Sequence, residues 1–293
     1  MGLWNIFRRE KTTSELSPSE LSNNQWFNLI CSSLEKQNLV IRGNPLPSFP
    51  SSDYQERTTG ISGKATLEEA FKFYCDCAQN FNGMNNALSE QSVVLDFGVG
   101  WGRIARFFLK ETPLNNIYGL DVEAESIQIC KECFGTNNFF VCSAYPPTQL
   151  AESTFTHIVG YSVFSHLSEE ACRLWMEEFH RLLKPNGSLA LTTRGNPFFR
   201  YCESLKGRTD LDSYSSGLST LFEDFEAAKS AYNRGEFVHS NKKEVSGGGA
   251  MTSEFYGETF IPEAYARDAY KQLFELHNFD TTKFHPTMFF KKK

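Results

Sequence analysis

The sequence lacks a long hydrophobic run. None of its 293 residues fall in a stretch of about 18 apolar residues, which is what a membrane-spanning helix needs. It also lacks an excess of positive charge, because 29 Lys and Arg stand against 35 Asp and Glu, for a net charge of −6. Proteins that bind nucleic acid generally carry a basic face. We therefore expect a cytoplasmic protein with no membrane span, and nucleic acid is a disfavoured partner.

The eight cysteines lack the spacing of a metal site. Cys130 and Cys133 form a CxxC pair, but no second pair stands at the spacing of a zinc ribbon. The pair also lies inside a helical pattern that runs from residue 125 to residue 133. We predict reduced, buried thiols and no metal site.

The first 65 residues have the character of an accessory segment. Helical spacing over residues 25–39 places Trp26, Leu29 and Ile30 on one apolar side. Residues 44–52 are rich in Pro and Ser and predict an irregular linker. Thr66 and Glu69 then have the spacing of a capping box, so we expect a helix to begin there. These features divide the chain into residues 1–65 and a larger domain over residues 66–293.

From residue 92 onward the pattern alternates between strand and helix. Strands are expected at residues 93–95, 117–120, 139–142, 157–161 and 188–193. Helices are expected from residue 103, at 124–133 and at 168–183, with a turn at 184–187. This alternation predicts an α/β fold with a parallel sheet that is covered on both faces.

The region 195–255 breaks this rhythm and is interpreted as an insertion. It holds one expected helix at residues 221–232 and a loose glycine-rich stretch at 246–249. A last helix is predicted at 262–277 and a closing strand at 287–290.

The most informative motif is a glycine loop between the first strand and the helix after it. Gly98, Gly100 and Gly102 alternate with other residues, Asp96 ends the strand, and Asp121 ends the next strand. Glycines in such a turn let the backbone approach a ligand, and the free N–H groups of a helix start favour negative groups. In open parallel sheets this position is the ligand crevice.

The spacing of the glycines disfavours a dinucleotide. A dinucleotide fingerprint is GxGxxG, whereas this loop is GxGxG with Arg103 in the sixth position. Asp96 would sit badly beside a pyrophosphate but suits an ammonium group. Asp121 stands where a carboxylate accepts two ribose hydroxyl groups.

Three stretches resemble class I S-adenosylmethionine-dependent methyltransferases. VLDFGVGWGRIARF and YGLDVEAESI are similar to the first two motifs of that family, and YSVFSHLSEEACRLWMEEFHRLLKPNGSLALTT is similar to its fourth strand, the helix that follows and the fifth strand. The resemblance implies a doubly wound, Rossmann-like, seven-stranded and mostly parallel sheet with helices on both faces. It also implies an enzyme whose cofactor is S-adenosylmethionine.

The resemblance assigns roles to individual residues. The three glycines would lie against the methionine part of the cofactor, Asp96 would orient its amino group, and Asp121 would hold its ribose. The remaining contacts would come from Val122, Ser143 and Ala144 around the adenine and from Tyr161 near the methionine moiety. For each residue a packing role is the alternative, and Gly102 could serve only helix–strand packing.

The residues at the end of the fourth strand limit the classes of methyl acceptor that are expected. It lacks the Asn/Asp-Pro-Pro-aromatic motif of many enzymes that methylate DNA adenine or amide nitrogens, and it lacks a Pro-Cys nucleophile. His166 follows in the loop and is a candidate general base for a hydroxyl acceptor. The alternative is that His166 packs beneath the cofactor and bonds to the backbone.

A substrate lid is expected in the region before the last helix. Tyr256 is the second candidate catalytic residue, while His239 and His285 are candidates by residue type only. We predict methyl transfer to a hydroxyl or amine of a small molecule or glycan, as in bacterial enzymes that modify sugars and cell surfaces. The alternatives are an NAD-dependent oxidoreductase and a non-catalytic cofactor-binding protein.

Overall fold

The computed structural model describes residues 17–36 and 39–293, so residues 1–16 and 37–38 of the predicted accessory segment lie outside the described residues. The N-terminal part contains η1 (Pro18–Glu20), α1 (Asn23–Ser32), β1 (Val40–Ile41), β2 (Asn44–Pro45), α2 (Ser52–Thr59) and α3 (Gly63–Gly83). The alternating part contains β3 (Val94–Phe97), η2 (Ala105–Lys110), η3 (Leu114–Asn116), β4 (Ile117–Asp121), α4 (Ala124–Phe134), β5 (Phe139–Val141), β6 (Phe155–Gly160), α5 (Glu169–Leu182) and β7 (Leu183–Thr192).

The last third of the chain leaves the sheet and then returns to it. The elements outside the sheet are α6 (Asn196–Ser204), α7 (Ser213–Ser219), α8 (Phe225–Asn233), β8 (Val238–Ser240), η4 (Lys243–Val245), β9 (Glu258–Phe260) and α9 (Glu263–Ala269). The sheet is completed by β10 (Phe274–Asp280) and β11 (Thr287–Lys292).

The central sheet has seven strands in the order β10-β11-β7-β6-β3-β4-β5. Strands β3 to β7 pair in parallel, and β11 runs antiparallel to both of its neighbours. The α/β, Rossmann-like, mostly parallel sheet expected from the sequence is therefore confirmed. The strand order reverses at β3, because β4 and β5 lie on one side of it and β6 and β7 lie on the other. Open parallel sheets bind their ligands at such a reversal point.

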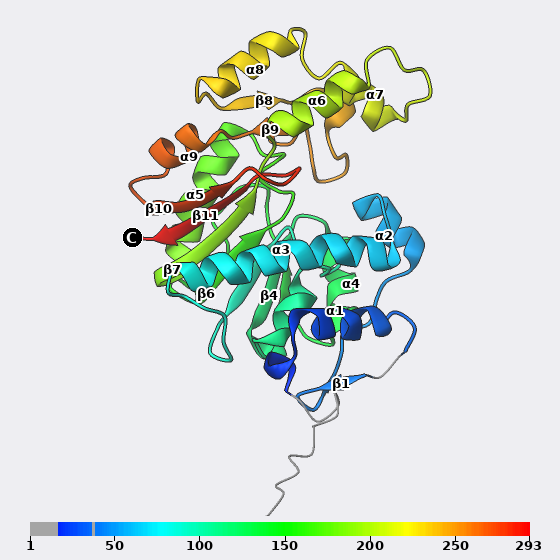
Figure 1. Cartoon of the computed structure of the whole chain (residues 1–293), viewed down its shortest axis with the longest axis vertical. Helices are drawn as coiled ribbons and strands as arrows, with labels where there is room; N and C mark the ends of the chain where they lie inside the picture. Colours follow the sequence, from blue (N-terminus) through cyan, green and yellow to red (C-terminus); the bar gives the residue numbers. More distant parts are fainter. Residues whose placement is uncertain (1–16, 37–38) are drawn as a thin grey trace, which may run out of the picture.

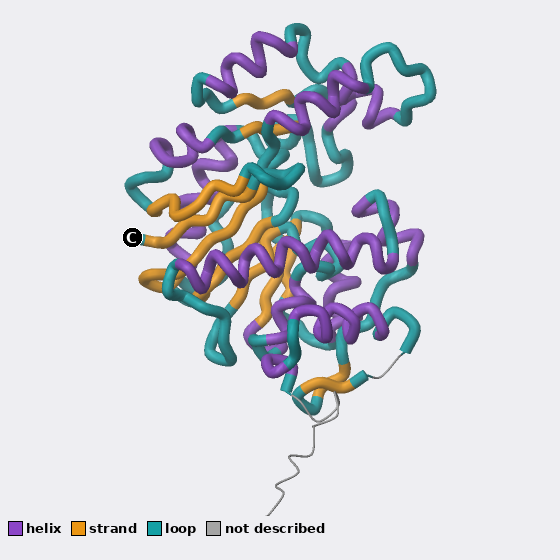
Figure 2. Tube along the Cα trace, in the orientation of Figure 1, coloured by secondary structure: helices purple, strands orange, loops and turns teal. Residues whose placement is uncertain are grey.

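Helices cover both faces of this sheet (Figures 1 and 2). Alternate strand residues point to opposite faces, and neighbouring residues accordingly join different cores. Val94 packs in the core that also holds side chains of α1, α3 and α4, whereas Leu95 packs in the core beneath α5 and α9. Within the described residues, no helix is both long enough and apolar enough to cross a membrane.

The segment after β7 has a small core of its own. Phe198, Phe199 and Phe225 pack there with Phe260 of β9, whose ring stacks on Phe199 at 3.9 Å between centroids. Figure 1 shows α6, α7 and α8 beyond the end of the sheet at which β7 finishes. The hairpin β8–β9 connects this segment to the sheet, because the backbone N–H of Arg194 donates to the carbonyl of Thr259. The segment therefore lies where the parallel strands have their carboxyl ends.

The predicted capping box at Thr66 is wrong. Helix α3 begins at Gly63, and the side chain of Gln55 on α2 accepts the hydrogen bond of the Gly63 N–H group. Thr66 is fully buried inside the helix, where its hydroxyl accepts a hydrogen bond from Arg103. The first turn of α3 is thus capped by a tertiary contact that local sequence does not show.

The predicted helix over residues 262–277 ends at Ala269, because the chain from Phe274 is strand β10. There Phe274 and Leu276 are buried while Glu275 and His277 are exposed, which is the two-residue period of a strand.

Three smaller predictions also differ from the structure. The predicted helix from residue 103 is the short 3-10 segment η2, and the predicted helix at 221–232 begins only at Phe225. The predicted turn at 184–187 lies within the bounds of β7, where the register with β6 shifts.

Candidate active site

The glycine loop connects β3 to η2 and turns through left-handed backbone. Gly98, Gly100 and Gly102 have φ values of +74°, +53° and +79°. A Cβ atom on Gly98 would lie 2.2 Å from the side chain of Val163, and one on Gly102 would lie 2.4 Å from that of Phe134. A Cβ atom on Gly100 would meet nothing within 4 Å. Gly98 and Gly102 therefore permit close packing, whereas Gly100 borders open space.

Asp121 connects this loop to the start of α4. Its Oδ2 accepts a hydrogen bond from the Gly100 N–H group at 2.8 Å, and its Oδ1 accepts one from the Glu123 N–H group at 2.9 Å. Each carboxylate oxygen has two lone pairs, so both oxygens retain one for a further donor. The carboxylate that we expect to bind ribose is thus fixed beside the one glycine of the loop that borders open space.

Asp96 is a buried acid with one oxygen unpaired. Its side chain is 1% exposed, and Oδ2 has no hydrogen-bond partner among the described residues. Burial raises the pKa of Asp96 to about 7, against a bond from the backbone of Ala105 that lowers it. An orphaned carboxylate oxygen beneath the glycine loop fits the ammonium group of a bound amino-acid moiety.

Asp96 gives the cofactor-free protein a testable pH dependence. Its pKa is about 7 when folded and 3.8 in the ordinary case, so between these values the folded state holds one proton more. Its contribution to the free energy of unfolding is complete below pH 3.8 and is lost as pH rises through 7, by about 1.4 kcal/mol per pH unit. Urea unfolding from pH 4.5 to 6.5 should show this slope as a difference between wild type and Asp96→Asn. Parallel curves would contradict the assigned pKa.

The other predicted cofactor residues stand near the same edge of the sheet. Val122 follows β4 and is half-buried, Ser143 after β5 is exposed, and the carbonyl of Ala144 accepts a hydrogen bond from Trp175. Tyr161 directly follows β6, and its hydroxyl donates to Glu69 of α3 at 2.7 Å. The role of each in cofactor binding stays a prediction.

His166 is held from several sides. Its Nδ1 lies 2.8 Å from the carbonyl oxygen of Gly257, which fixes the proton on Nδ1 because a carbonyl only accepts. Its Nε2 lies 3.4 Å from a guanidinium nitrogen of Arg194. The ring stacks on Tyr256 with 4.6 Å between centroids and 4° between planes. The remaining lone pair therefore faces a cation, which favours the structural alternative over the general base.

Replacing His166 by alanine should consequently destabilise the fold. The change leaves the Gly257 carbonyl without its donor and removes the stacking on Tyr256, at a cost of about 1–3 kcal/mol. Thermal unfolding followed by circular dichroism measures the loss. A variant as stable as wild type, whose methyl transfer has lost its dependence on pH, would instead identify His166 as the base.

Two residues that the sequence analysis did not single out lie at the centre of the polar cluster. Arg194 follows β7, and its Nε donates to Oε2 of Glu258 at 2.9 Å. Glu258 begins β9 and is fully buried, and its Oε1 accepts a hydrogen bond from Tyr214 at 2.5 Å. Burial would raise the pKa of Glu258, but the charges of Arg194 and then His166 lower it to about 2. The only local signal was an arginine directly after an apolar strand.

The two histidines that were candidates by type also lie in this cluster. His285 is 2.8 Å from Arg194 through Nδ1, and burial and then the charge of Arg194 lower its pKa to about 3. His239 on β8 is 2.7 Å from the hydroxyl of Thr259 through Nδ1. The structure thus brings Tyr256, His166, His239 and His285 together around the Arg194–Glu258 pair.

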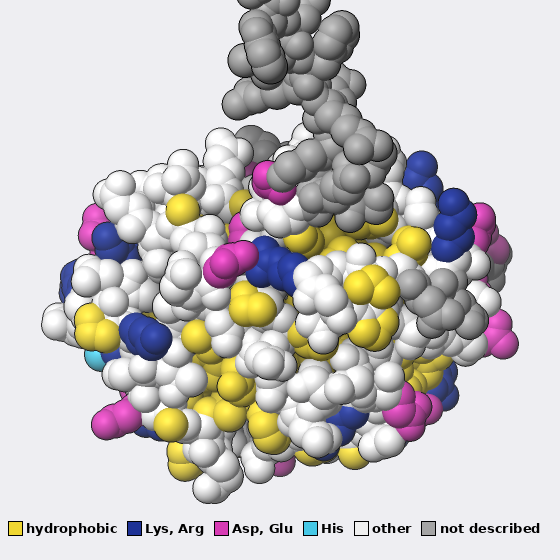
Figure 3. All heavy atoms as spheres, turned by 90° about the horizontal axis from the view of Figure 1, so that it is seen from below, with side chains coloured by type: hydrophobic (Ala, Val, Ile, Leu, Met, Phe, Trp, Pro, Cys, Tyr) yellow, Lys and Arg dark blue, Asp and Glu magenta, His cyan; other side chains and the backbone are white. Residues whose placement is uncertain are grey.

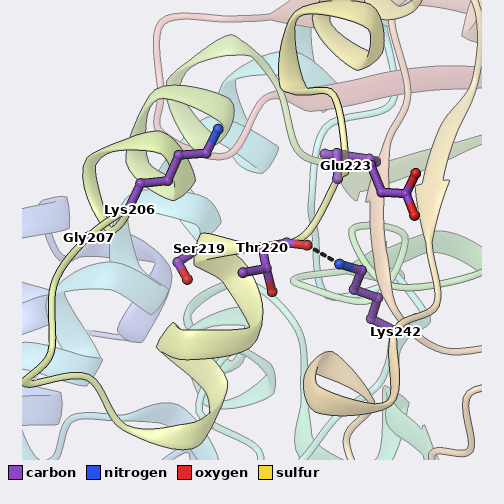
Figure 4. Close-up of a pocket in the computed structure, with 7 residues that line it drawn as sticks. Lys206, Gly207, Ser219, Thr220, Glu223 and Lys242 are labelled. Atoms are coloured by element: carbon purple, nitrogen blue, oxygen red, sulfur yellow. Dashed lines mark hydrogen bonds between the residues drawn. The ribbon is translucent and has the colours of Figure 1, made fainter.

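A separate cavity of about 460 Å³ lies within the inserted segment, between residues 206–207, 219–223 and 242. Figure 4 shows its polar lining, in which Lys242 donates to the carbonyl of Thr220. A second lysine, Lys206, lies 4.0 Å from the ring centroid of Phe225. None of the predicted site residues lines this cavity. It is therefore distinct from the polar cluster at the end of the sheet.

Comparison with known families assigns the class of the domain. Residues 94–187 match the model of a family described as "Methyltransferase domain". This range begins at β3, contains the glycine loop and Asp121, and ends within β7. Residues 94–187 therefore match a methyltransferase domain, and this match implies an enzyme whose cofactor is S-adenosylmethionine.

Solved structures are similar over a larger part of the chain. The PH0226 protein of Pyrococcus horikoshii is 16% identical, over 85% of this chain and 95% of that one, with a TM-score of 0.48. An S-adenosylmethionine-dependent methyltransferase of Methanosarcina mazei is 17% identical, over 71% and 96%, also at 0.48. Another from Mesorhizobium loti is 11% identical, over 74% and 99%, at 0.47. No curated protein matches the chain.

Proposed function

We propose that the protein transfers a methyl group from S-adenosylmethionine to a hydroxyl or amine of a small molecule or glycan. The observation that supports this acceptor class is the polar cluster around Glu258, which is buried between the carboxyl end of the sheet and the inserted segment. A covered site of this kind suits a small acceptor better than a polymer. Arg194 and Glu258 also neutralise each other there, so the cluster does not call for a charged acceptor.

The cofactor is proposed to bind along the glycine loop. Gly100 offers the open approach, Asp121 accepts the ribose hydroxyl groups, and Asp96 accepts the ammonium group. Val122, Ser143 and Ala144 would border the adenine, and Tyr161 would lie near the methionine moiety. The bound cofactor supplies an electrophilic methyl group, and much of the rate of such a transfer comes from holding the nucleophile in line with it.

The charge distribution supports a partner other than nucleic acid. Figure 3 shows the end of the molecule opposite the inserted segment, where Lys, Arg, Asp and Glu side chains lie scattered among uncharged ones. On that face neither sign forms a continuous patch. With the net charge of −6, that face offers little to a phosphate backbone.

Replacing Asp121 by alanine should weaken the binding of S-adenosylmethionine at least tenfold. Hydrogen bonds to a charged group contribute about 1.5–3 kcal/mol each, and the same change releases the Gly100 N–H group that shapes the loop. Isothermal titration of both proteins measures the effect. Asp53→Ala on the exposed side of α2 is the control. An affinity equal to wild type would remove Asp121 from the site.

The class of reaction is tested by titration and by transfer. Wild type should bind S-adenosylmethionine and S-adenosylhomocysteine but not NAD, and it should move a labelled methyl group to a hydroxyl or amine in a panel of metabolites and sugars. Binding of NAD in place of S-adenosylmethionine would favour an oxidoreductase. Tight binding of S-adenosylmethionine without transfer to any compound would favour a non-catalytic protein.

A further inference from the structure

The hairpin β8–β9 carries a half-buried histidine, His239, whose protonation the hydrogen bonds define. Nδ1 of His239 lies 2.7 Å from Oγ1 of Thr259, and that hydroxyl donates its single proton to the carbonyl of Leu167 at 2.6 Å. Since the Thr259 proton is already used, the proton between the two groups belongs to Nδ1. The neutral ring therefore carries a lone pair on Nε2.

This lone pair has no partner in the part of the chain that the structure describes. Nε2 of His239 is buried, and no donor among the described residues reaches it. Buried polar atoms are nearly always paired, so an orphan of this kind marks a place for a ligand or an ordered water. Burial lowers the pKa of His239 to about 4, with Glu258 acting to raise it and His166 to lower it. The lone pair is thus free at neutral pH.

The hairpin rests directly on the loop that follows β6. The Gly257 N–H group donates to the carbonyl of His166, and the Thr259 N–H group donates to that of Ser165, each at 2.8 Å. The bridge Leu167↔Tyr256 extends the same contact. His239 is therefore fixed beside the loop that follows β6, and that loop begins at Tyr161, the residue expected near the cofactor's methionine moiety.

We propose that Nε2 of His239 accepts the hydrogen bond of the methyl acceptor's O–H or N–H group and takes its proton during transfer, an inference that rests on the proposed function. A bond forms between the acceptor's oxygen or nitrogen and the methyl carbon, and the bond from sulfur to that carbon breaks. The electron pair stays on sulfur and leaves S-adenosylhomocysteine. The proton moves to Nε2, where the carboxylate of Glu258 stabilises the imidazolium. The acceptor group is accordingly a neutral hydrogen-bond donor.

Two variants separate this role from a structural one. In His239→Asn the amide nitrogen takes the place of Nδ1 and keeps the bond to Thr259, but the acceptor at Nε2 is lost. In His239→Gln an amide oxygen takes the place of Nε2 without the ability to accept a proton. Both should bind S-adenosylmethionine within about twofold of wild type and unfold at a similar temperature, and both should transfer methyl groups at least roughly 100-fold more slowly. Wild-type rates for His239→Asn, or for His239→Gln, would overturn the proposal.

Nitrogen NMR tests the inference without any transfer. Long-range ¹H–¹⁵N correlation spectra are recorded for wild type at pH 7, and the signals of His239 are assigned as those absent from the spectrum of His239→Asn. In wild type these signals should show a protonated Nδ1 and an unprotonated Nε2. A proton on Nε2 would overturn the proposal even if wild type is an active methyltransferase. If wild type binds S-adenosylmethionine but methylates nothing in the panel, the proposed function fails separately, and the state of Nε2 still decides whether His239 presents an acceptor.

Discussion

Replacing Glu258 by alanine should lower the free energy of unfolding by about 3–5 kcal/mol, because it leaves the charge of Arg194 buried without its partner. Arg194 is 5% exposed and Glu258 is fully buried, so water does not replace the lost carboxylate. The change also removes the acceptor of the Tyr214 hydroxyl, which fastens α7 to the site. Urea unfolding followed by circular dichroism measures the difference.

A double variant and a surface variant serve as controls for this result. Arg194→Met combined with Glu258→Leu removes both charges and should recover much of the stability, as replacing a whole buried ion pair often does. Glu226 pairs with Lys229 at 2.8 Å but has a 78% exposed side chain, so Glu226→Ala should cost less than about 1 kcal/mol. A loss for Glu258→Ala no larger than that of the surface variant would mean that the buried pair does not secure the inserted segment.

Replacing Gly100 by valine should abolish detectable binding of S-adenosylmethionine. Gly100 has a φ of +53°, and a Cβ atom there would enter the open space into which the cofactor must come. A non-glycine residue in this backbone region costs about 1–2 kcal/mol, and we expect the fold to tolerate this cost because the added Cβ atom meets nothing within 4 Å. The test is isothermal titration of a variant whose circular dichroism matches wild type.

Gly135 provides the matched control for that variant. It ends α4 with a φ of +64°, and a Cβ atom there also meets nothing within 4 Å. It stands at the opposite end of α4 from Asp121, so Gly135→Val carries similar backbone strain outside the proposed site. The control should bind the cofactor normally. An equal loss of S-adenosylmethionine affinity in both variants would attribute the effect to backbone strain. Retained binding in Gly100→Val would mean that the glycine loop serves only packing.

The parts of the fold that follow from short-range patterns could be predicted. The helix α5 could be predicted because Ser168 caps it and the acidic residues Glu169 and Glu170 stand in its first turn. The alternation of short, mainly apolar strands with helices between residues 93 and 193 predicted the parallel sheet. The glycine loop and Asp121 could be predicted because the loop directly follows β3 and Asp121 ends the neighbouring strand β4.

The centre of the polar cluster could not be predicted in the same way. Arg194 and Glu258 are 64 residues apart, and nothing in either neighbourhood specifies the other as partner. Glu258 lies within the stretch that was expected to form a lid. Tyr256 was named there as a candidate catalytic residue, whereas Glu258 was not. The start of α3 was missed for a similar reason, since its cap comes from Gln55 on another helix. In both cases the structure depends on a contact between residues that are distant in the sequence, or that belong to different helices.

A crystal structure of the protein with S-adenosylhomocysteine tests the proposed site most directly. The account predicts ribose hydroxyl groups within hydrogen-bonding distance of Asp121 and the homocysteine ammonium group on Asp96. It also predicts that the sulfur faces the cluster of Arg194, Glu258 and His239. A ligand bound away from the glycine loop, or one whose sulfur points away from the hairpin β8–β9, would contradict it.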